Sequence, residues 1–325
     1  MLRTKLAVSV LSFSLLMGSA AAMAKTVFIA SDVHPADYPT TAAVIHMGEK
    51  LSQQTDGRLS IRMFPSGQMG DESTTLEKTR AGAIDILRVS MAPVGGILPQ
   101  VSVFNMPFVF RDTDHQHKVL DGDIGNTLAK EISDSNLGLV FLGWMDAGSR
   151  SLITKKPITS LDDLKGVKIR LQNNPIGLDT FKALGANPIV LPVGDVFASL
   201  QTGVIDAAEN NEPTFDTENY VVAGTKYFDL TEHFMIPEVL AFSKRKWSKL
   251  SADDQALIMK LAKEAQAEER VLWAEYVEKS KQRLQSQGVK FLPVDKKPFV
   301  DATAPVREKY GKQFSDLMQQ IQDTK

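Results

Sequence analysis

Three arginines stand at the ends of predicted strands in this 325-residue chain. Arg88 and Arg170 close strands that we predict over residues 83–89 and 166–171, and Arg150 directly precedes a third strand-like run. In open α/β sheets, ligands bind beyond the carboxyl ends of the strands. Because a guanidinium can hold a carboxylate through two parallel hydrogen bonds, these arginines predict recognition of an organic acid.

Other polar side chains lie close to predicted strand ends and helix starts, where they could complete such a site. Amide and carboxylate groups can hydrogen-bond to hydroxyl groups such as those of a sugar. Besides the three arginines, the candidate binding residues are His34, Glu72, Gln172, Asn174, Asn210 and Asn211. No nucleophile with a partnering base stands among them, so the set predicts ligand binding and not turnover.

Several of these residues also have an ordinary structural interpretation. Arg88 could form a plain salt bridge with Asp85 or Glu77, and Arg170 could face the solvent. Glu72 could simply begin a helix, where a carboxylate favours the dipole. The two consecutive asparagines could form a turn before the proline that follows them.

The chain lacks the common catalytic and nucleotide-binding signatures, including the Gly-x-Ser-x-Gly elbow, the Walker loop, His-Glu-x-x-His and the Rossmann glycines. His115 and His117 are expected at the surface, and neither a metal nor a cofactor is expected. The alternative of another class is an exported hydrolase or lyase acting on sugar acids. In that case His34 with Glu72 or Asp37 would supply the acid and base.

Composition excludes several classes of protein. The chain has 37 Lys+Arg against 39 Asp+Glu, 43% hydrophobic residues and no cysteine. Balanced charge with ample apolar content excludes disorder, and the absence of cysteine excludes disulfide scaffolds and Cys-ligated metals. Without a basic excess, a nucleic-acid partner is not expected.

Residues 1–24 are predicted to be a secretory signal peptide. A basic start precedes a serine-diluted apolar run at 6–17, and Ala22-Met23-Ala24 fits the small-x-small cleavage pattern. The run is short for a transmembrane helix, so an uncleaved anchor is the less favoured interpretation. Since no cysteine follows it, lipid attachment is not expected. We therefore expect a periplasmic protein that begins at Lys25.

Two stretches of alternating strands and helices predict an α/β fold with two lobes. The elements expected in the first are strands at 26–31, 58–64 and 83–89 and helices at 38–55 and 72–80. Those expected in the second are strands at 166–171, 187–191 and 204–208 and helices at 177–184 and 195–201. We place lobe I at 25–149, with part of 240–325 returning to it, and lobe II at 150–239.

Residues 251–287 show helical spacing of apolar residues with no proline or glycine. An unbroken helix of this length would reach roughly 55 Å, which is longer than one small domain is wide. We therefore predict that it spans both lobes. The alternative is two helices with a bend near Glu268.

Several motifs in order resemble the solute-binding proteins of tripartite ATP-independent periplasmic (TRAP) transporters, of the dicarboxylate-binding-protein type. They include Phe-Pro-Ser-Gly-Gln-Met-Gly at 64–70, Thr-Arg-Ala-Gly-Ala-Ile-Asp at 79–85 and Asn-Met-Pro-Phe-Val-Phe-Arg at 105–111. The stretches 164–173 and 199–210 match the signature of the second lobe. The resemblance covers essentially all of the chain after residue 25.

This resemblance implies a type II-like binding protein whose two lobes close about a hinge on an organic acid. It implies that Arg170 forms the salt bridge to the ligand carboxylate and that Arg150 is the other ligand-contacting arginine. Asn210 matches the asparagine of the family's second-lobe motif. The protein, expected to be a monomer, would deliver its ligand to the membrane subunits of a TRAP permease.

Glu72, Arg88 and the Asn210-Asn211 pair resemble members of the family that bind hexuronates. A buried glutamate needs hydrogen-bond donors, which sugar hydroxyls supply, whereas a second ligand carboxylate would be repelled. We therefore favour a sugar acid such as D-glucuronate or D-galacturonate over a C4-dicarboxylate or another organic acid. A chemosensory ligand-binding subunit is an alternative that the sequence does not separate from transport.

Overall fold

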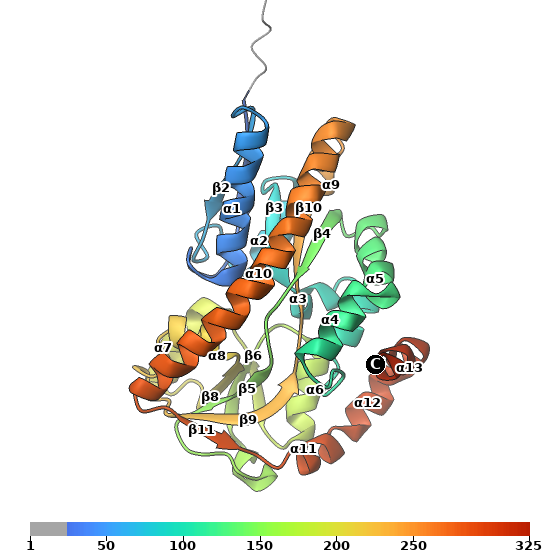
Figure 1. Cartoon of the computed structure of the whole chain (residues 1–325). Coiled ribbons are helices and arrows are strands. Elements are labelled where there is room, and N and C mark those ends of the chain that lie inside the picture. The colour runs from blue at the N-terminus through green and yellow to red at the C-terminus, as the bar shows by residue number, and fades with distance from the viewer. Residues whose placement is uncertain (1–24) are drawn as a thin grey trace, which may run out of the picture.

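The computed structural model describes residues 25–325, so the signal peptide predicted at 1–24 lies outside the described residues. The described chain forms two lobes, each built on a mixed β-sheet with helices packed around it (Figure 1). We call the five-stranded sheet with its helices lobe I and the six-stranded sheet with its helices lobe II. The predicted two-lobed α/β fold is thereby confirmed. None of the helices in residues 25–325 combines the length and the apolar character needed to cross a membrane.

The lobe I sheet has the strand order β2-β1-β3-β10-β4. Its strands are β1 (Thr26–Ser31), β2 (Leu59–Phe64), β3 (Ile86–Ser90), β4 (Leu139–Met145) and β10 (Glu238–Ser243). The accompanying helices are α1 (Pro39–Gln54), α2 (Glu72–Ala81), α3 (Met91–Gly95), the 3-10 helix η1 (Pro99–Asn105), α4 (Thr113–Asp121), α5 (Asp123–Asp134) and α9 (Lys244–Trp247). β10 pairs antiparallel with β3 and β4, so a late segment of the chain completes this sheet.

The lobe II sheet has the strand order β11-β9-β5-β8-β6-β7. Its strands are β5 (Arg150–Thr154), β6 (Lys168–Leu171), β7 (Asn187–Val190), β8 (Ala207–Asn210), β9 (Tyr227–Phe234) and β11 (Lys290–Pro293). The accompanying helices are the 3-10 helices η2 (Leu161–Leu164) and η3 (Val193–Asp195) and the α-helices α6 (Pro175–Ala183), α7 (Val196–Thr202) and α8 (Glu212–Thr217).

One helix, α10 (Ala252–Ser286), runs along both lobes as predicted (Figure 1). The hydroxyl of Ser251 accepts a hydrogen bond from the backbone N–H of Asp254 and so caps its first turn. The helix packs against α1 and β4 in lobe I and against α8 in lobe II. It is continuous through Glu268, so the alternative of two helices with a bend there is wrong.

The core of lobe I explains why α1 and α10 lie where they do. Val44, Met47 and Leu51 recur on one face of α1 and are buried against the sheet and against Leu261 and Ala265 of α10. Each buried side chain of this size contributes roughly 1.5–3 kcal/mol from apolar burial. This shared apolar interface holds α10 to lobe I.

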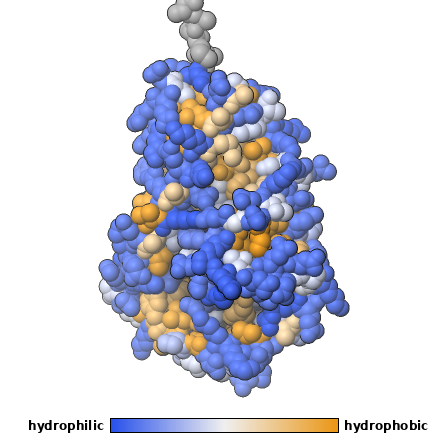
Figure 2. Space-filling model, turned by 45° about the vertical axis from the view of Figure 1, so that its right-hand side comes forward, coloured by the Kyte–Doolittle hydropathy of each residue, from blue (hydrophilic) through white to orange (hydrophobic). Residues whose placement is uncertain are grey.

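The chain ends in three short helices, α11 (Lys297–Ala302), α12 (Ala304–Gly311) and α13 (Ser315–Asp323). α12 packs against α6 of lobe II, and α13 packs against α5 of lobe I. Hydrophilic residues cover most of the face seen in the space-filling view, with smaller apolar areas between them (Figure 2). Most large apolar side chains of the described residues are buried inside the two lobes.

Two strands start three residues later than predicted, for the same reason. Gly82 and Gly203 end α2 and α7 in the left-handed conformation, with φ of 82° and 77°. The residues after each glycine bond back to the preceding helix, as when Ala83 N–H donates to the Lys78 carbonyl. β3 and β8 therefore begin three residues after their predicted starts, and β8 extends to Asn210, two residues past its predicted end.

Candidate ligand-binding site

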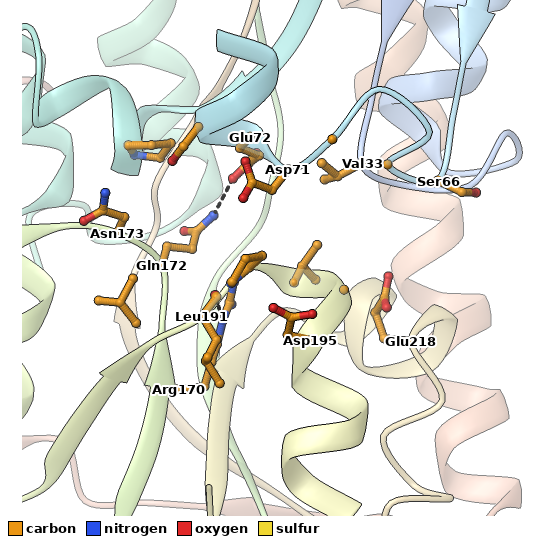
Figure 3. Close-up of a pocket in the computed structure, with 18 of the residues that line it drawn as sticks. Val33, Ser66, Asp71, Glu72, Arg170, Gln172, Asn173, Leu191, Asp195 and Glu218 are labelled. Carbon is orange, nitrogen blue, oxygen red and sulfur yellow. Dashed lines mark hydrogen bonds between the residues drawn. The ribbon is translucent and has the colours of Figure 1, made fainter. Parts of the chain in front are cut away.

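A cleft of about 690 Å³ lies between the two lobes. Lobe I contributes the loop around Ser66 and the start of α2, and lobe II contributes Arg170, Gln172 and the segment 190–195 (Figure 3). The cleft continues into an inner chamber of about 20 Å³, which is room for about one water molecule. The candidates that line this chamber are His34, Glu72, Arg88, Arg150, Arg170, Gln172, Asn210 and Asn211.

Sheet register brings the lobe II candidates together. Arg170 lies near the carboxyl end of β6, where it is paired with Ala208 on the parallel strand β8. β5 runs antiparallel to β8 with Ser151 opposite Asn210, which places Arg150 beside the same end. Residues that are 20 to 60 positions apart in sequence therefore converge on one edge of the sheet, as ligand sites in α/β folds require.

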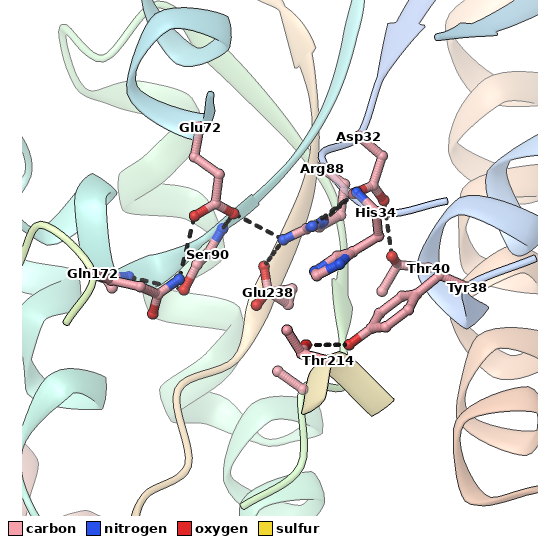
Figure 4. A network of polar contacts seen from close by, with 12 residues as sticks. Asp32, His34, Tyr38, Thr40, Glu72, Arg88, Ser90, Gln172, Thr214 and Glu238 are labelled. Carbon is pink, nitrogen blue, oxygen red and sulfur yellow. Dashed lines mark hydrogen bonds and ion pairs between the residues drawn. The ribbon is translucent and has the colours of Figure 1, made fainter. Parts of the chain in front are cut away.

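Arg88 lies at the lobe I wall of the chamber and is paired with three carboxylates (Figure 4). Its Nη2 donates to Asp32 Oδ1 at 2.6 Å, and its Nη1 donates to Glu72 Oε1 at 2.8 Å and to Glu238 Oε2 at 2.5 Å. Its Nε donates to Asp32 Oδ1 at 3.1 Å. Most of its five N–H donors are therefore occupied by the protein itself.

The pKa values of this cluster follow from burial and charge. Burial would raise the pKa of Asp32, but the Arg88 cation outweighs burial and leaves that pKa below its ordinary value. Burial raises the pKa of Glu238 to about 7, and the pull of Arg88 is partly offset by the negative charge of Glu72. The sequence suggested a salt bridge from Arg88 to Asp85 or Glu77, and this prediction is wrong. Asp85 accepts from the backbone N–H of Ile29, and Glu77 pairs with Arg80.

Arg150 is also occupied by the protein, through Glu209 and Asn210. Its Nε and Nη2 donate to the two carboxylate oxygens of Glu209 at 2.6 and 2.7 Å, a bidentate pair. Its Nη1 donates to Asn210 Oδ1 at 2.9 Å. Burial would raise the pKa of Glu209, but Arg150 outweighs burial and lowers it to about 2. The amide nitrogen of Asn210 donates no hydrogen bond to the described residues and is free for a ligand.

Arg170 differs from both of the other arginines. Its Nε donates to the Leu191 carbonyl at 2.8 Å, and within residues 25–325 its guanidinium has no ion-pair partner. The side chain is buried, and burial lowers its pKa. It lines both the outer cleft and the inner chamber. Arg170 is therefore a buried cation facing the cleft without a counter-ion from the described chain, and a bound anion would compensate it. The interpretation of Arg170 as a solvent-facing strand residue is wrong.

His34 contributes a neutral ring to the chamber. Burial, together with the nearby Arg88 cation, lowers its pKa to about 3. The ring stacks on Tyr38 with 3.9 Å between centroids, and its Nδ1 meets no hydrogen-bond partner among the described residues. A neutral imidazole of this kind can hydrogen-bond to a ligand hydroxyl, but it adds no positive charge for an anion.

Three polar contacts join the lobes across the cleft. Gln172 Nε2 donates to Glu72 Oε2 at 3.2 Å, and the Tyr38 hydroxyl lies 3.1 Å from Thr214 Oγ1 (Figure 4). Tyr38 also donates to Asn211 Oδ1 at 3.5 Å. Asn211 further accepts from the N–H of Thr214 and so caps α8. Its polar atoms are thus already engaged by the protein, which makes its role at the chamber wall structural.

Asn174 is the one candidate that the structure places outside the chamber. Its Oδ1 accepts from the backbone N–H of Ile176 and caps α6, with its side chain buried there. The expectation for His115 is also wrong, because this ring is buried and lies 2.8 Å from the Ile321 carbonyl. His117, which is partly exposed, pairs with Asp146 at 2.8 Å.

Asp32, Glu209 and Glu238 take part in the site but were not predicted. Each one pairs with an arginine that was predicted. A signal was present for Glu238, which is the only charged residue in the otherwise apolar stretch 234–242. A lone charge in such a stretch is rarely buried without a partner. For Asp32 the signal was its position directly after the first predicted strand, where ligand-site residues are expected.

The family model described as bacterial extracellular solute-binding protein, family 7, matches residues 30–313. The chain belongs to this family. Solved structures of TRAP periplasmic solute-binding proteins match this family member over almost its whole described length, which confirms the predicted resemblance.

One of these structures is a protein from Citrobacter koseri with bound D-glucuronate. It is 50% identical to this chain, covers 92% of this chain and 100% of its own, and has a TM-score of 0.90. The apo, open structure from the same organism is 49% identical, covers 91% and 98%, and has a TM-score of 0.81. This family member is therefore closer in shape to the ligand-bound structure than to the open one.

Two further proteins are similar to this family member. One from Pseudomonas putida F1 with bound D-glucuronate is 48% identical, covers 92% of this chain and 97% of its own, and has a TM-score of 0.90. One from a Bradyrhizobium species, in complex with α/β-D-galacturonate, is 41% identical, covers 92% and 100%, and has a TM-score of 0.88.

Proposed function

We propose that this protein is the periplasmic solute-binding component of a TRAP transporter and that its ligand is a hexuronate, such as D-glucuronate or D-galacturonate. The observation that carries the proposal is the buried Arg170 guanidinium, which lines the cleft without an ion-pair partner among residues 25–325. A ligand carboxylate would supply the missing counter-charge through charge-assisted hydrogen bonds. The solved relatives that bind D-glucuronate or D-galacturonate support the same ligand class.

The polar groups around the chamber match the hydrogen-bonding needs of the hydroxyl groups of a sugar acid. His34 is neutral, Asn210 has a free amide nitrogen, and Glu72 and Glu238 present carboxyl oxygens. A sugar ring carries hydroxyls that can donate to the carboxyls and accept from the amide. A C4-dicarboxylate, the alternative ligand, would leave these groups without donors and bring a second negative charge among them.

Binding operates by closure of the two lobes on the ligand. Arg150, Arg170 and Asn210 belong to lobe II, whereas His34 and Glu72 belong to lobe I. A ligand that touches both sets gains its full affinity only when the lobes meet, so it shifts the equilibrium toward the closed form. The cross-lobe contacts of Gln172 and Tyr38, and the greater likeness to the ligand-bound relative, support this mechanism.

The site favours binding over the alternative of hydrolase or lyase activity. A general base should have a pKa near the operating pH, whereas the pKa of His34 is lowered to about 3. The other suggested base, Asp37, is exposed and lies 3.5 Å from the Tyr276 hydroxyl. Purified protein should therefore leave a uronate chemically unchanged after long incubation, as judged by mass spectrometry.

The proposal also covers where the protein acts and with what partner. We place it in the periplasm as a monomer that delivers its ligand to the membrane subunits of a TRAP permease. The family description supports an extracellular protein that binds solutes, and the solved relatives are described as periplasmic. Cell fractionation tests the location. Uptake of labelled uronate into vesicles that contain the permease subunits tests the delivery.

The ligand class is tested by calorimetry and thermal-shift measurements on the purified protein. The panel comprises D-glucuronate, D-galacturonate, succinate, L-malate and D-glucose. We expect saturable binding and a raised melting temperature with at least one uronate. D-glucose, which lacks the carboxylate, should give neither. Stabilisation by succinate alone would contradict the proposal.

A further inference from the structure

As far as the described residues 25–325 go, the lobe I wall of the chamber presents no unmatched cation to a ligand. Arg88, the cation at this wall, is nearly inaccessible, with 1% of its side chain exposed, and it is surrounded by Asp32, Glu72 and Glu238. With every carboxyl ionised, the four groups would carry a formal net charge of −2. The lobe II wall, by contrast, carries the unmatched Arg170. The two ends of the chamber therefore differ in charge.

Glu238 is the carboxyl of this wall that has the fewest partners. Glu72 accepts from Arg88, from the Ser90 N–H at 3.0 Å and from Gln172 at 3.2 Å. Asp32 is enclosed and accepts from Arg88, from the Thr40 hydroxyl and from the backbone N–H of His34. Among residues 25–325, Glu238 accepts only from Arg88, through Oε2. Within the described chain no hydrogen bond reaches its Oε1, although the residue lines the chamber.

This inference rests on the proposed function. We propose that Glu238, supported by Glu72, determines which acids this site accepts, by receiving ligand hydroxyls at the end of the chamber opposite Arg170 and by rejecting a second carboxylate there. The site is thus selective for monocarboxylic sugar acids over aldaric acids, in which the same carbon chain ends in two carboxylates. The selectivity arises from a repulsive element as well as from an attractive one.

Desolvation makes the lobe I end of the chamber more favourable for a hydroxyl than for a carboxylate. A hydroxyl that enters the lobe I end can donate to Glu238 Oε1 and so replaces the water that would otherwise solvate it. A carboxylate at the same place has no proton to donate and finds Arg88 already occupied. In a site with little water it also lies against the carboxylates of Asp32 and Glu72 and, above about pH 7, against that of Glu238, so the repulsion is greatest at alkaline pH. Its affinity is therefore reduced, although Arg170 would hold its other end.

The experiment compares D-glucuronate with D-glucarate by calorimetry on wild type, Glu238→Gln and Glu72→Gln. Glutamine keeps the size of the side chain and an acceptor oxygen but removes the charge. We expect wild type to bind glucuronate at least 100-fold more tightly than glucarate. In Glu238→Gln this ratio should fall at least tenfold, with glucuronate affinity reduced by no more than about tenfold. Glu72→Gln should shift the ratio in the same direction.

Glu308→Gln is the matched control, because Glu308 is an exposed carboxylate on α12 that lines neither the cleft nor the inner chamber, and its loss changes the net charge equally. Its ratio should stay within twofold of wild type. Glucuronate can close into a ring and glucarate cannot, but this difference is the same for every variant. A change in the affinity ratio between variants therefore reports the altered side chain at the lobe I wall. A purely structural role for Glu238 would weaken both ligands alike.

The outcomes separate this inference from the proposed function. Glucuronate binding with a ratio that is unchanged in both Glu238→Gln and Glu72→Gln overturns the inference alone. Equal affinity of wild type for the two acids also overturns it. Absence of binding to any uronate by wild type overturns the proposed function and this inference with it. If Glu238→Gln does not fold, the Glu72→Gln ratio decides, since Glu72 keeps two other donors and is more exposed.

Discussion

Arg88 and Arg170 are both buried arginines on strands, one in each lobe, and both line the inner chamber. Arg88 is paired with three carboxylates, whereas Arg170 makes a single hydrogen bond to a backbone carbonyl and has no ion pair within residues 25–325. A buried arginine beside a cleft is therefore not by itself an anion site. The site is identified by positive charge that the protein leaves unmatched.

The same difference separates structural from functional electrostatics. Removing one partner of a buried ion pair leaves an uncompensated charge in the protein, so Arg88 should matter mainly for folding. Arg170 already bears the cost of burial without a partner, so its compensation comes from a ligand. Stability and affinity should therefore respond in opposite ways to the loss of these two side chains.

The largest effect is expected from Arg88→Met. This change leaves Asp32, Glu72 and Glu238 buried together without their cation. The free energy of unfolding of the ligand-free protein should fall by about 3–5 kcal/mol, as is typical of a broken buried pair. Urea denaturation followed by circular dichroism measures it. A loss below 1 kcal/mol would show that the cluster is not a structural unit.

Arg170→Met should have the opposite profile. Uronate affinity should fall by about 2–5 kcal/mol, or roughly 30-fold to several thousand-fold, because a desolvated carboxylate loses its charged partner. The ligand-free protein should be as stable as wild type or more so, because an unmatched buried cation has been removed. Calorimetry and urea denaturation measure the two quantities. Arg62→Met, at an exposed position, is the control, and near-normal affinity of Arg170→Met would contradict the site assignment.

A pH series sharpens the comparison at the lobe I wall. Burial raises the pKa of Glu238 from 4.5 to about 7, so between these values the folded protein binds a proton that the unfolded chain does not. Wild type should therefore lose stability relative to Glu238→Gln as the pH rises from about 4.5 to about 7, by roughly 1–3 kcal/mol in all. The difference should then level off. A constant difference between pH 4.5 and pH 8 would contradict the raised pKa.

Tyr38→Phe tests the polar contacts between the two lobes and leaves the charged groups at the lobe I and lobe II walls of the chamber unchanged. It removes the hydroxyl that bonds to Thr214 and Asn211 across the cleft, at 3.1 and 3.5 Å, and keeps the ring stacked on His34. Loss of about 0.5–1.5 kcal/mol from the closed form should weaken every ligand about 3- to 10-fold. The ratio of glucuronate to glucarate affinity should not change. A ligand-dependent effect would place Tyr38 in recognition.

The smallest effect is expected from Asn174→Ala. Since Asn174 caps α6 away from the chamber, the variant should lose about 1 kcal/mol of stability and retain wild-type affinity. Thermal denaturation and calorimetry measure these two quantities. Asn210→Ala is the informative partner, because Asn210 accepts from Arg150 and faces the chamber, so its loss should weaken binding. Weakened binding in Asn174→Ala would contradict the position of this residue outside the binding site.

Much of the fold could be predicted because its signals are local. Helical spacing of apolar residues predicted α1 and α10 to within one or two residues, and glycines predicted where α2 and α7 end. The starts of β3 and β8 were missed because the residues after those glycines bond back to the preceding helix, which depends on backbone geometry and not on side-chain pattern.

The amino-acid sequence by itself determined the family, the two-lobed α/β fold and the positions of arginines at strand ends, since each of these depends on residues close together in the chain. Only the tertiary structure decided which arginine is left without a partner. The carboxylates that occupy Arg88 lie 16, 56 and 150 positions away from it, on α2, directly after β1 and on β10. Charge pairing inside a protein depends on distance in space, and for Arg88 the packing of the lobe I elements sets that distance.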